Sequence, residues 1–186
     1  TVARVLKRHA LLLSFALSAC TTARATSGAA IAPPPLDLGP PATFQGVVRY
    51  EARRPTLQGA STTLESRPAR FVEVVAEDAS HRELSRTVTD AEGRFTLQAP
   101  ARVPAIAVLA HVSREGSDVR VSPQGDGSVT HALRLSRPDA SRAIELVAAD
   151  ATPDGIAGAF HIADTILTGL DATRSWTGQT LPPLVV

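Results

Sequence analysis

Short runs of β-branched and apolar residues, separated by turn residues, occupy most of the chain from Phe44 onward. The runs recur at a spacing of roughly 8 to 15 residues, which is typical of an all-β sandwich or barrel. The sequence therefore predicts a mostly β fold, a β-sandwich of about seven strands. These strands are expected at residues 44–51, 71–77, 84–89, 94–98, 105–112, 119–122 and 129–135.

Alternating hydrophobicity in two of these strands predicts one face toward a core and one toward water. The inward positions are Val72, Val74 and Ala76 in one strand and Val129, Leu133 and Leu135 in the other. The run Ala105–Ala110 is apolar throughout, so it is expected at the centre of a sheet with both faces covered. A domain of about 95 residues of this kind can bury a self-sufficient core.

The segment Thr87–Leu97 carries the most specific internal signal. Asp90 is followed three positions later by Gly93, between two alternating runs. An Asp side chain can accept hydrogen bonds from nearby backbone amides, and Gly readily adopts the positive φ of a bulged turn. We therefore expect a tight hairpin here, with Phe95 and Leu97 on the same face of its second strand.

With this turn, the chain resembles the carboxypeptidase regulatory-like module, a transthyretin-like β-sandwich. The resemblance covers about residues 44–136 and rests on three segments in order, Gly46–Val48, Pro68–Val74 and Thr89–Phe95. It implies a transthyretin-like or Ig-like sandwich with a non-catalytic role. The stretch Arg53–Arg67 is longer than a simple hairpin needs and is expected to be an insertion.

Residues 137–186 are expected to form a linker with one helix, and Ala143–Val147 is a candidate last strand. An amphipathic helix is predicted over residues 160–174 because apolar residues recur at helical spacing. The face expected to dock on a neighbour consists of Ile162, Ile166 and Leu170, with Ala163 and Leu167 beside them. Trp176 is expected to act as a packing anchor after the helix.

Ala157–Phe160, the helix and the run Leu181–Leu184 are also similar to a linker in multidomain secreted lipoproteins, where a regulatory-like module precedes a metallopeptidase-like domain. This likeness, together with the lack of Met in the sequence, favours a polypeptide that is longer than the one given. A reading frame that continues past Val186 into an H-E-x-x-H helix would support a metallopeptidase.

Cys20, the only cysteine, follows a segment with the parts of a secretory signal. Arg4, Lys7 and Arg8 form a basic region, and Ala10–Leu17 is an apolar region of the length that the export machinery reads. This region is too short to span a bilayer, which takes about 20 apolar residues.

The run Leu17-Ser18-Ala19-Cys20 resembles the lipobox of bacterial lipoproteins, an aliphatic residue and two small residues before an obligatory Cys. The resemblance implies that residues 1–19 are removed as a signal peptide and that Cys20 carries a diacylglyceryl group and an acylated amino terminus. Several acyl chains, at about 0.8 kcal/mol per buried methylene, give a stable membrane anchor. The alternatives are a buried structural cysteine, a free thiol and half of an intermolecular disulfide.

Residues 20–43 are expected to form a disordered tether between the lipid and the sandwich. They are rich in Thr, Ala, Ser, Gly and Pro and carry almost no charge. Such a segment buries too little apolar surface to offset the entropy of ordering it. Thr21 is not the Asp that retains lipoproteins in the inner membrane, which favours the outer membrane of a bacterial cell envelope.

The charge balance gives no sign of a nucleic-acid partner. The sequence has 19 Lys and Arg against 18 Asp and Glu, and removal of residues 1–19 takes away three basic residues and no acidic one, which leaves a net charge of −2. Arg53, Arg54, Arg67 and Arg70 are expected to form either a solvated rim or a patch for an acidic partner.

No candidate for catalysis or metal binding has a complete set of residues. His161 and Asp164 are three positions apart on the predicted helix, but no H-E-x-x-H motif or Cys pair completes a zinc set. His81–Glu83 is expected in a solvated turn, and Asp90 and Glu92 lie on a turn with no evident pocket. We therefore expect no catalytic residue, no metal and no cofactor.

The sequence thus predicts a non-enzymatic, membrane-anchored lipoprotein whose sandwich serves structural support or recognition. Two alternatives stay open. The chain is the N-terminal accessory part of a secreted metallopeptidase, or it is a stand-alone lipoprotein that binds a sugar or a protein through exposed sandwich loops.

Overall fold

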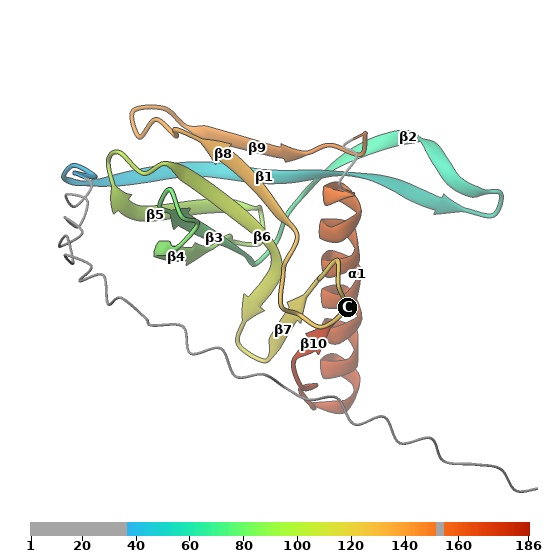
Figure 1. Ribbon diagram of the computed structural model, residues 1–186. Helices are drawn as coiled ribbons and strands as arrows, with labels where there is room; N and C mark the ends of the chain where they lie inside the picture. The colour runs from blue at the N-terminus through green and yellow to red at the C-terminus, as the bar shows by residue number, and fades with distance from the viewer. Residues whose placement is uncertain (1–36, 152–154) are drawn as a thin grey trace, which may run out of the picture. The chain divides into compact units, whose positions relative to one another are not determined.

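The structure, a computed structural model, describes residues 37–151 and 155–186, which belong to one compact unit, Leu36–Val186. The expected signal peptide, Cys20 and most of the tether lie outside the described residues. Within them the chain forms ten strands in two sheets and one C-terminal helix (Figure 1). The mostly β sandwich with a C-terminal helix is confirmed, and the expected number of strands is too low.

The first sheet contains β1 (Pro41–Thr56), β2 (Gly59–Pro68), β5 (Arg94–Pro100) and β9 (Ile144–Ala148). The second sheet contains β3 (Val72–Glu77), β4 (Glu83–Val88), β6 (Ala105–Arg114), β7 (Ser117–Arg120), β8 (Ala132–Ser136) and β10 (Leu184–Val185). The helix α1 spans Ile156–Thr177.

The first sheet is built around β1, which has partners on both of its edges. Along one edge, β5 pairs with Pro41–Val47 and β2 with Arg49–Thr56, both antiparallel. β9 pairs in parallel with Gly46–Tyr50, and since this range overlaps both others, β9 lies on the opposite edge. A Cβ at Gly46 would lie 2.3 Å from the carbonyl oxygen of Ile144, so the close approach of β9 requires glycine there.

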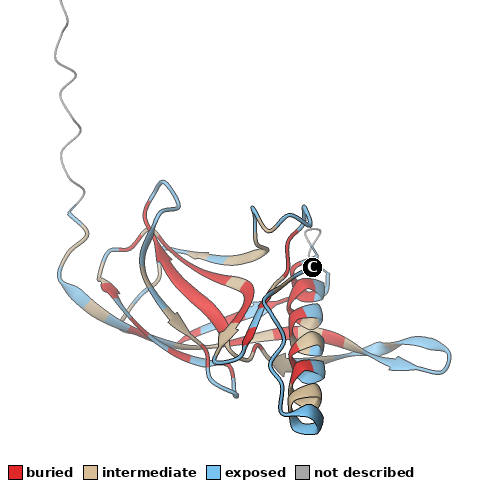
Figure 2. Cartoon of the chain, turned by 90° about the horizontal axis from the view of Figure 1, so that it is seen from below, coloured by how far each residue is buried: buried red, intermediate tan, exposed pale blue. Residues whose placement is uncertain are grey.

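The second sheet is built around β6, which is buried along almost its whole length. β3 pairs with one edge of β6, and β7 and β8 pair with successive parts of the other edge. The prediction that Ala105–Ala110 is a central strand is therefore confirmed. Inward residues of the two sheets form one core, coloured red in Figure 2.

The turn at Asp90 forms as predicted, but the expected hairpin is wrong. Asp90 Oδ1 accepts hydrogen bonds from the backbone amides of Glu92 and Arg94 at 2.9 and 2.7 Å, and Gly93 has a φ of 76°. The strand before the turn, β4, pairs with β3, whereas the strand after it, β5, pairs with β1. The turn is thus a corner that carries the chain from one sheet to the other. Phe95 and Leu97 both enter the core, as expected.

The stretch Arg53–Arg67, which is expected to be an insertion, is mostly strand. The end of β1 and most of β2 form a two-stranded arm, residues 53–64, that projects from the sandwich (Figure 1). Leu57 at its tip is 102% exposed. At its root, Arg53 donates two hydrogen bonds to Asp150 Oδ2, at 3.0 and 2.7 Å.

Two further boundaries differ from the expectation. Val129 lies outside β8 and is 47% exposed, whereas Leu133 and Leu135 pack against the core as predicted. The sandwich also does not close at residue 136, because β9 and α1 contribute buried residues to the same core.

α1 bridges the two sheets through contacts with β1 and β9 of the first and β6 and β7 of the second (Figure 1). Its buried face is formed by Ile156, Ala157, Ala159, Phe160, Ala163, Leu167 and Leu170. The helix is confirmed, but it begins at Ile156 and its buried face is rotated from the predicted one, so that Ile162 is 47% exposed. Trp176 is 84% exposed, so it is not a packing anchor. In the described part of the chain no helix has the length and hydropathy needed to cross a membrane.

Candidate functional site

Two ionisable side chains are almost fully buried on the outer face of the second sheet, where β3, β6 and β7 run side by side. Glu73 and His111 are only 3% and 5% exposed. His111 Nε2 lies 2.8 Å from Asp118 Oδ1, and its Nδ1 lies 2.9 Å from Glu73 Oε2. Arg86 of β4 donates a hydrogen bond of 2.6 Å to the other oxygen of Glu73. We call Glu73, Arg86, His111 and Asp118 the sheet cluster.

The charges of the sheet cluster stabilise one another. Hydrogen bonding to Glu73, against the opposing effect of burial, raises the pKa of His111, and Asp118 raises it further. Burial acts to raise the pKa of Glu73, but His111 and Arg86 together hold it below its usual value.

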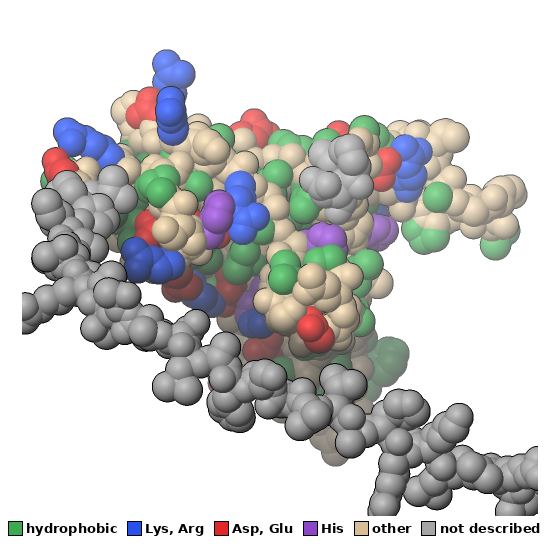
Figure 3. All heavy atoms as spheres, in the orientation of Figure 1, with side chains coloured by type: hydrophobic (Ala, Val, Ile, Leu, Met, Phe, Trp, Pro, Cys, Tyr) green, Lys and Arg blue, Asp and Glu red, His purple; other side chains and the backbone are tan. Residues whose placement is uncertain are grey.

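Both ring nitrogens of His111 face a carboxylate oxygen, so neither is open toward a ligand. A protonated histidine carries a hydrogen on both ring nitrogens, so it cannot ligate a metal or accept a proton. The sheet cluster therefore joins four strands, β3, β4, β6 and β7, through side-chain contacts between them. Figure 3 shows acidic and basic side chains lying next to one another on the surface it displays.

His161 and Asp164, the metal candidates from the sequence, come together at the junction of α1 and β1. The Tyr50 hydroxyl donates a hydrogen bond of 2.7 Å to Asp164 Oδ2, and Arg70 Nε donates one of 2.7 Å to Oδ1. The His161 ring stacks on Tyr50 with centroids 6.1 Å apart. Burial and then the bond to Asp164 raise the pKa of Tyr50 above its ordinary 10.0. Both carboxylate oxygens of Asp164 thus fix the helix to the sandwich.

His81 and the four arginines expected at a rim each lie beside a carboxylate. His81 lies in the turn after β3 with its Nδ1 3.0 Å from Glu77 Oε2. Each of the four arginines expected at a rim faces a carboxylate: Arg53 pairs with Asp150, Arg54 and Arg67 with Glu65, and Arg70 with Asp164. Over residues 37–151 and 155–186, no three His, Cys, Asp or Glu side chains gather as they would around a metal ion.

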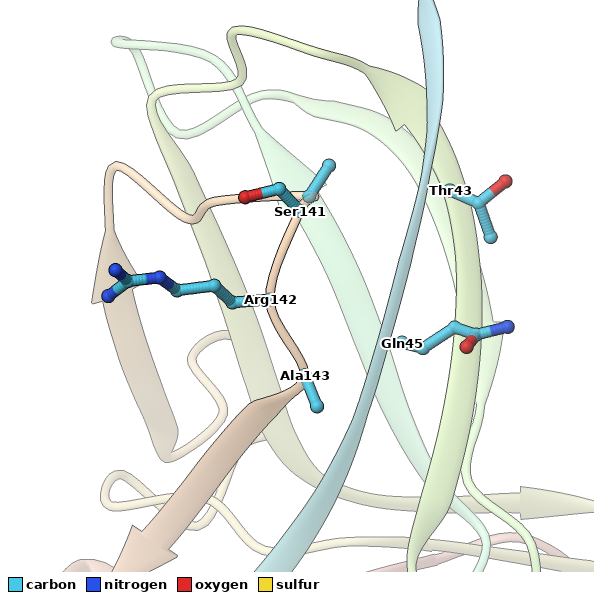
Figure 4. Close-up of a pocket in the computed structure, with 6 residues that line it drawn as sticks. Thr43, Gln45, Ser141, Arg142 and Ala143 are labelled. Atoms are coloured by element: carbon cyan, nitrogen blue, oxygen red, sulfur yellow. The ribbon is translucent and has the colours of Figure 1, made fainter.

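Two adjoining hollows lie along β1. One of about 150 Å³ separates the start of β1 from the loop 140–143 and is lined by Thr43, Gln45, Ala140, Ser141, Arg142 and Ala143 (Figure 4). The other, of about 400 Å³, is lined by Gln45, Gly46, Val47, Arg94, Ala143, Ile144 and Glu145.

The smaller hollow exposes a strand edge. Pairing with β9 begins only at Gly46, so the preceding residues of β1 pair with β5 alone among the described strands. Asp139 holds the facing loop in its own turn by accepting hydrogen bonds from the backbone amide and the hydroxyl of Ser141. The Arg142 side chain points away from β1 (Figure 4).

The sheet cluster was missed from the sequence because its members are far apart in the chain. The only signal is that Glu73 and Glu77 interrupt the apolar strand Val72–Glu77, since a charged residue in such a strand needs a partner.

No family model and no curated protein matches the chain. Among solved structures it is similar to a 9R-lipoxygenase from Cyanothece PCC8801, with 15% identity and a TM-score of 0.29. The similarity covers 59% of this chain and 16% of the lipoxygenase chain. Its TM-score is too low to bear on either fold or function.

Proposed function

We propose that this chain is a lipid-anchored, non-catalytic β-sandwich that supports or recognises other components of the bacterial cell envelope. The observation that carries the proposal is that its most buried ionisable groups pair with one another between strands and helix. Glu73 with His111, and Asp164 with Tyr50, are examples. Catalytic groups instead converge on a cavity where a reacting atom can sit.

The anchor in this proposal is supported by the run Leu17–Cys20 and the basic and apolar segments before it. Attachment through Cys20, with removal of residues 1–19, would place the sandwich at a membrane surface, and Thr21 favours the outer membrane. A transthyretin-like relationship to carboxypeptidase regulatory-like modules is part of the same proposal, and the turn at Asp90 supports it.

The proposal is tested by replacing the lipid-bearing residue. Cys20→Ala should move the protein from the membrane fraction to the soluble fraction and abolish incorporation of labelled palmitate. Thr21→Ala, a change at the neighbouring position, is the matched control and should leave both unchanged. A Cys20→Ala protein that still fractionates with membranes would refute the anchor.

A second function, binding of an extended peptide, is favoured by the free edge of β1 at the smaller hollow. An extended peptide can add a strand to an unpaired sheet edge through backbone hydrogen bonds. Thr43→Pro would remove one backbone donor from this edge. It should abolish any rise in melting temperature that a peptide library produces, while Thr96→Pro on the neighbouring strand tests for a general loss of stability. No shift with any peptide would count against this function.

A further inference from the structure

The outer face of the first sheet carries an arginine and a glutamate in one row across three strands. Val47 of β1 is opposite Arg94 of β5 on one side and opposite Glu145 of β9 on the other. Residues that face each other across neighbouring strands have their side chains on the same side of the sheet. The next residues of two of these strands, Val48 and Phe95, are buried in the core, so the row points outward. We call Arg94, Val47 and Glu145 the sheet row.

The sheet row lies in the larger of the two hollows along β1, which has a volume of about 400 Å³. The lining of this hollow combines the two charged side chains and the Gln45 amide with apolar residues, which are Gly46, Val47, Ala143 and Ile144. Sites for small molecules usually have volumes of about 300 to 1,000 Å³ and a mostly apolar lining with a few polar groups. The hollow therefore has the size and the composition of a site for a small ligand.

Both charges of the sheet row are available to a ligand. Glu145 has no ion pair and no side-chain hydrogen bond among the described residues. Arg94 makes an ion pair of 3.7 Å with Glu92, and these two side chains are 69% and 61% exposed. Such an exposed pair contributes little, so Arg94 can exchange it for a ligand. Arg94 and Glu145 form no ion pair with each other, because their strands lie two strand spacings apart, about 10 Å.

The order cation, apolar side chain, anion fits a ligand with the complementary order of charges. A guanidinium binds a carboxylate through two parallel hydrogen bonds, and a carboxylate accepts hydrogen bonds from an ammonium group. An extended chain spans at most about 3.5 Å per residue, so the charged ends of a peptide of two or three residues are about 7 to 10 Å apart. This length matches the span of the sheet row, and small apolar side chains of the peptide would rest on Val47.

We propose that the sheet row binds a short zwitterionic peptide of two or three residues. The peptide lies across the three strands, with its carboxylate at Arg94 and its ammonium group at Glu145. Both contacts are exposed to water, so the affinity is low, with a dissociation constant of about 1 mM. In naming a ligand, the proposal rests on the recognition role proposed above, but it does not depend on attachment through Cys20.

The site is tested by titrating the full chain, kept in mild detergent, with the dipeptide alanyl-alanine and following the backbone amide signals by NMR. Saturable shifts should centre on the sheet row. Arg94→Gln and Glu145→Gln should each weaken binding by about fivefold, the upper end for one exposed ion pair. Arg49→Gln is the matched control, because Arg49 lies on the same face of β1, opposite Val147 and outside the hollow, and this change should leave the affinity unaltered.

The orientation of the peptide is tested with blocked forms of the same dipeptide. Acetylation of the amino end removes the cation, so binding of this form should be weakened by Arg94→Gln and unaffected by Glu145→Gln. Amidation of the carboxyl end removes the anion and should reverse the pattern. If both forms responded equally to both substitutions, the proposal would be overturned.

Two further outcomes would also overturn the proposal. One is the lack of any saturable shift at the sheet row at dipeptide concentrations well above the expected dissociation constant. The other is a set of shifts confined to residues 41–45 and lost in Thr43→Pro, which would assign the peptide to the free edge of β1. Fractionation of the Cys20→Ala protein is a separate measurement, so failure of this site and failure of the anchor are distinguishable.

Discussion

The outer face of the second sheet and the outer face of α1 differ in opposite ways from an ordinary protein surface. On the sheet, Glu73 and His111 are ionisable and yet buried, and each lies against the other. On the helix, Ile162 and Trp176 are apolar and yet exposed, and no described residue covers them. The comparison shows that this domain uses its ionisable side chains to join its own elements.

The largest effect is expected when one member of the sheet cluster is removed. Glu73→Gln keeps the shape of the side chain but leaves the buried His111 beside a neutral partner. Loss of one partner of a buried ion pair should lower the free energy of unfolding by about 3 kcal/mol. Urea unfolding measures this change. Glu92→Gln, at an exposed turn, should alter stability by less than about 0.5 kcal/mol. If Glu73→Gln and Glu92→Gln lowered the free energy of unfolding equally, the burial of Glu73 would add nothing to its contribution to stability.

The pH dependence of stability should reflect the same cluster. The pKa of His111 is raised from 6.5 by folding, so its contribution is complete below about pH 6.5 and is lost as pH rises through the folded value. The pKa of Glu73 is lowered from 4.5, so its contribution is complete above about pH 4.5 and is lost as pH falls through the folded value. Melting temperature should therefore be highest between these two values. His111→Gln should flatten the decline on the alkaline side; an unchanged profile would contradict the assignment.

A smaller effect is expected where the helix meets the sandwich. Tyr50→Phe removes the hydroxyl that donates to Asp164, while Arg70 still binds the carboxylate. The cost should be about 1 kcal/mol of unfolding free energy, the usual contribution of one hydrogen bond. In a double-mutant cycle with Asp164→Ala, the two changes should be non-additive. Additive effects would show that this contact contributes nothing to docking of the helix.

The smallest effect on folding is expected at the exposed side chains of α1. Ile162→Ser and Trp176→Ser should each change the unfolding free energy of the monomer by less than about 0.5 kcal/mol, because both side chains are largely exposed. Leu167→Ala, on the buried face of the same helix, should cost about 2 to 5 kcal/mol. Unfolding of the three variants in dilute solution measures this contrast. A large loss of unfolding free energy in Ile162→Ser would contradict the difference between the exposed and the buried face of α1.

Local patterns predicted those parts of the fold that depend on nearby residues. Alternation located β3 and the apolar run located β6, because one or both faces of these strands meet the core. The Asp90 turn was predicted because its hydrogen bonds lie within four residues. The helix was also predicted, but its buried face could not be chosen correctly, since Ile162 and Phe160 are both apolar and only the position of the sheets decides between them.

Long-range pairing decided what the sequence alone left open. β2 contains two Thr and two Ser among its ten residues and has no buried residue, so it gives no hydrophobic alternation to detect. The sequence predicts that the two strands beside the Asp90 turn pair with each other. In the structure the strand before the turn, β4, pairs with β3, and the strand after it, β5, pairs with β1. The sheet cluster depends on the register that brings Glu73, His111 and Asp118 together from three strands.

The position of β1 also determines how the domain would bear mechanical tension applied through the chain before it. A pull on the start of β1 acts along the strand, at right angles to the hydrogen bonds of its ladders. Pro41–Val47 pairs with β5 on one edge, and Gly46–Tyr50 pairs with β9 on the other. These bonds are loaded together in shear rather than opened one at a time. A strand held on both edges in this way makes the first element after the proposed tether a firm point of attachment for the rest of the domain.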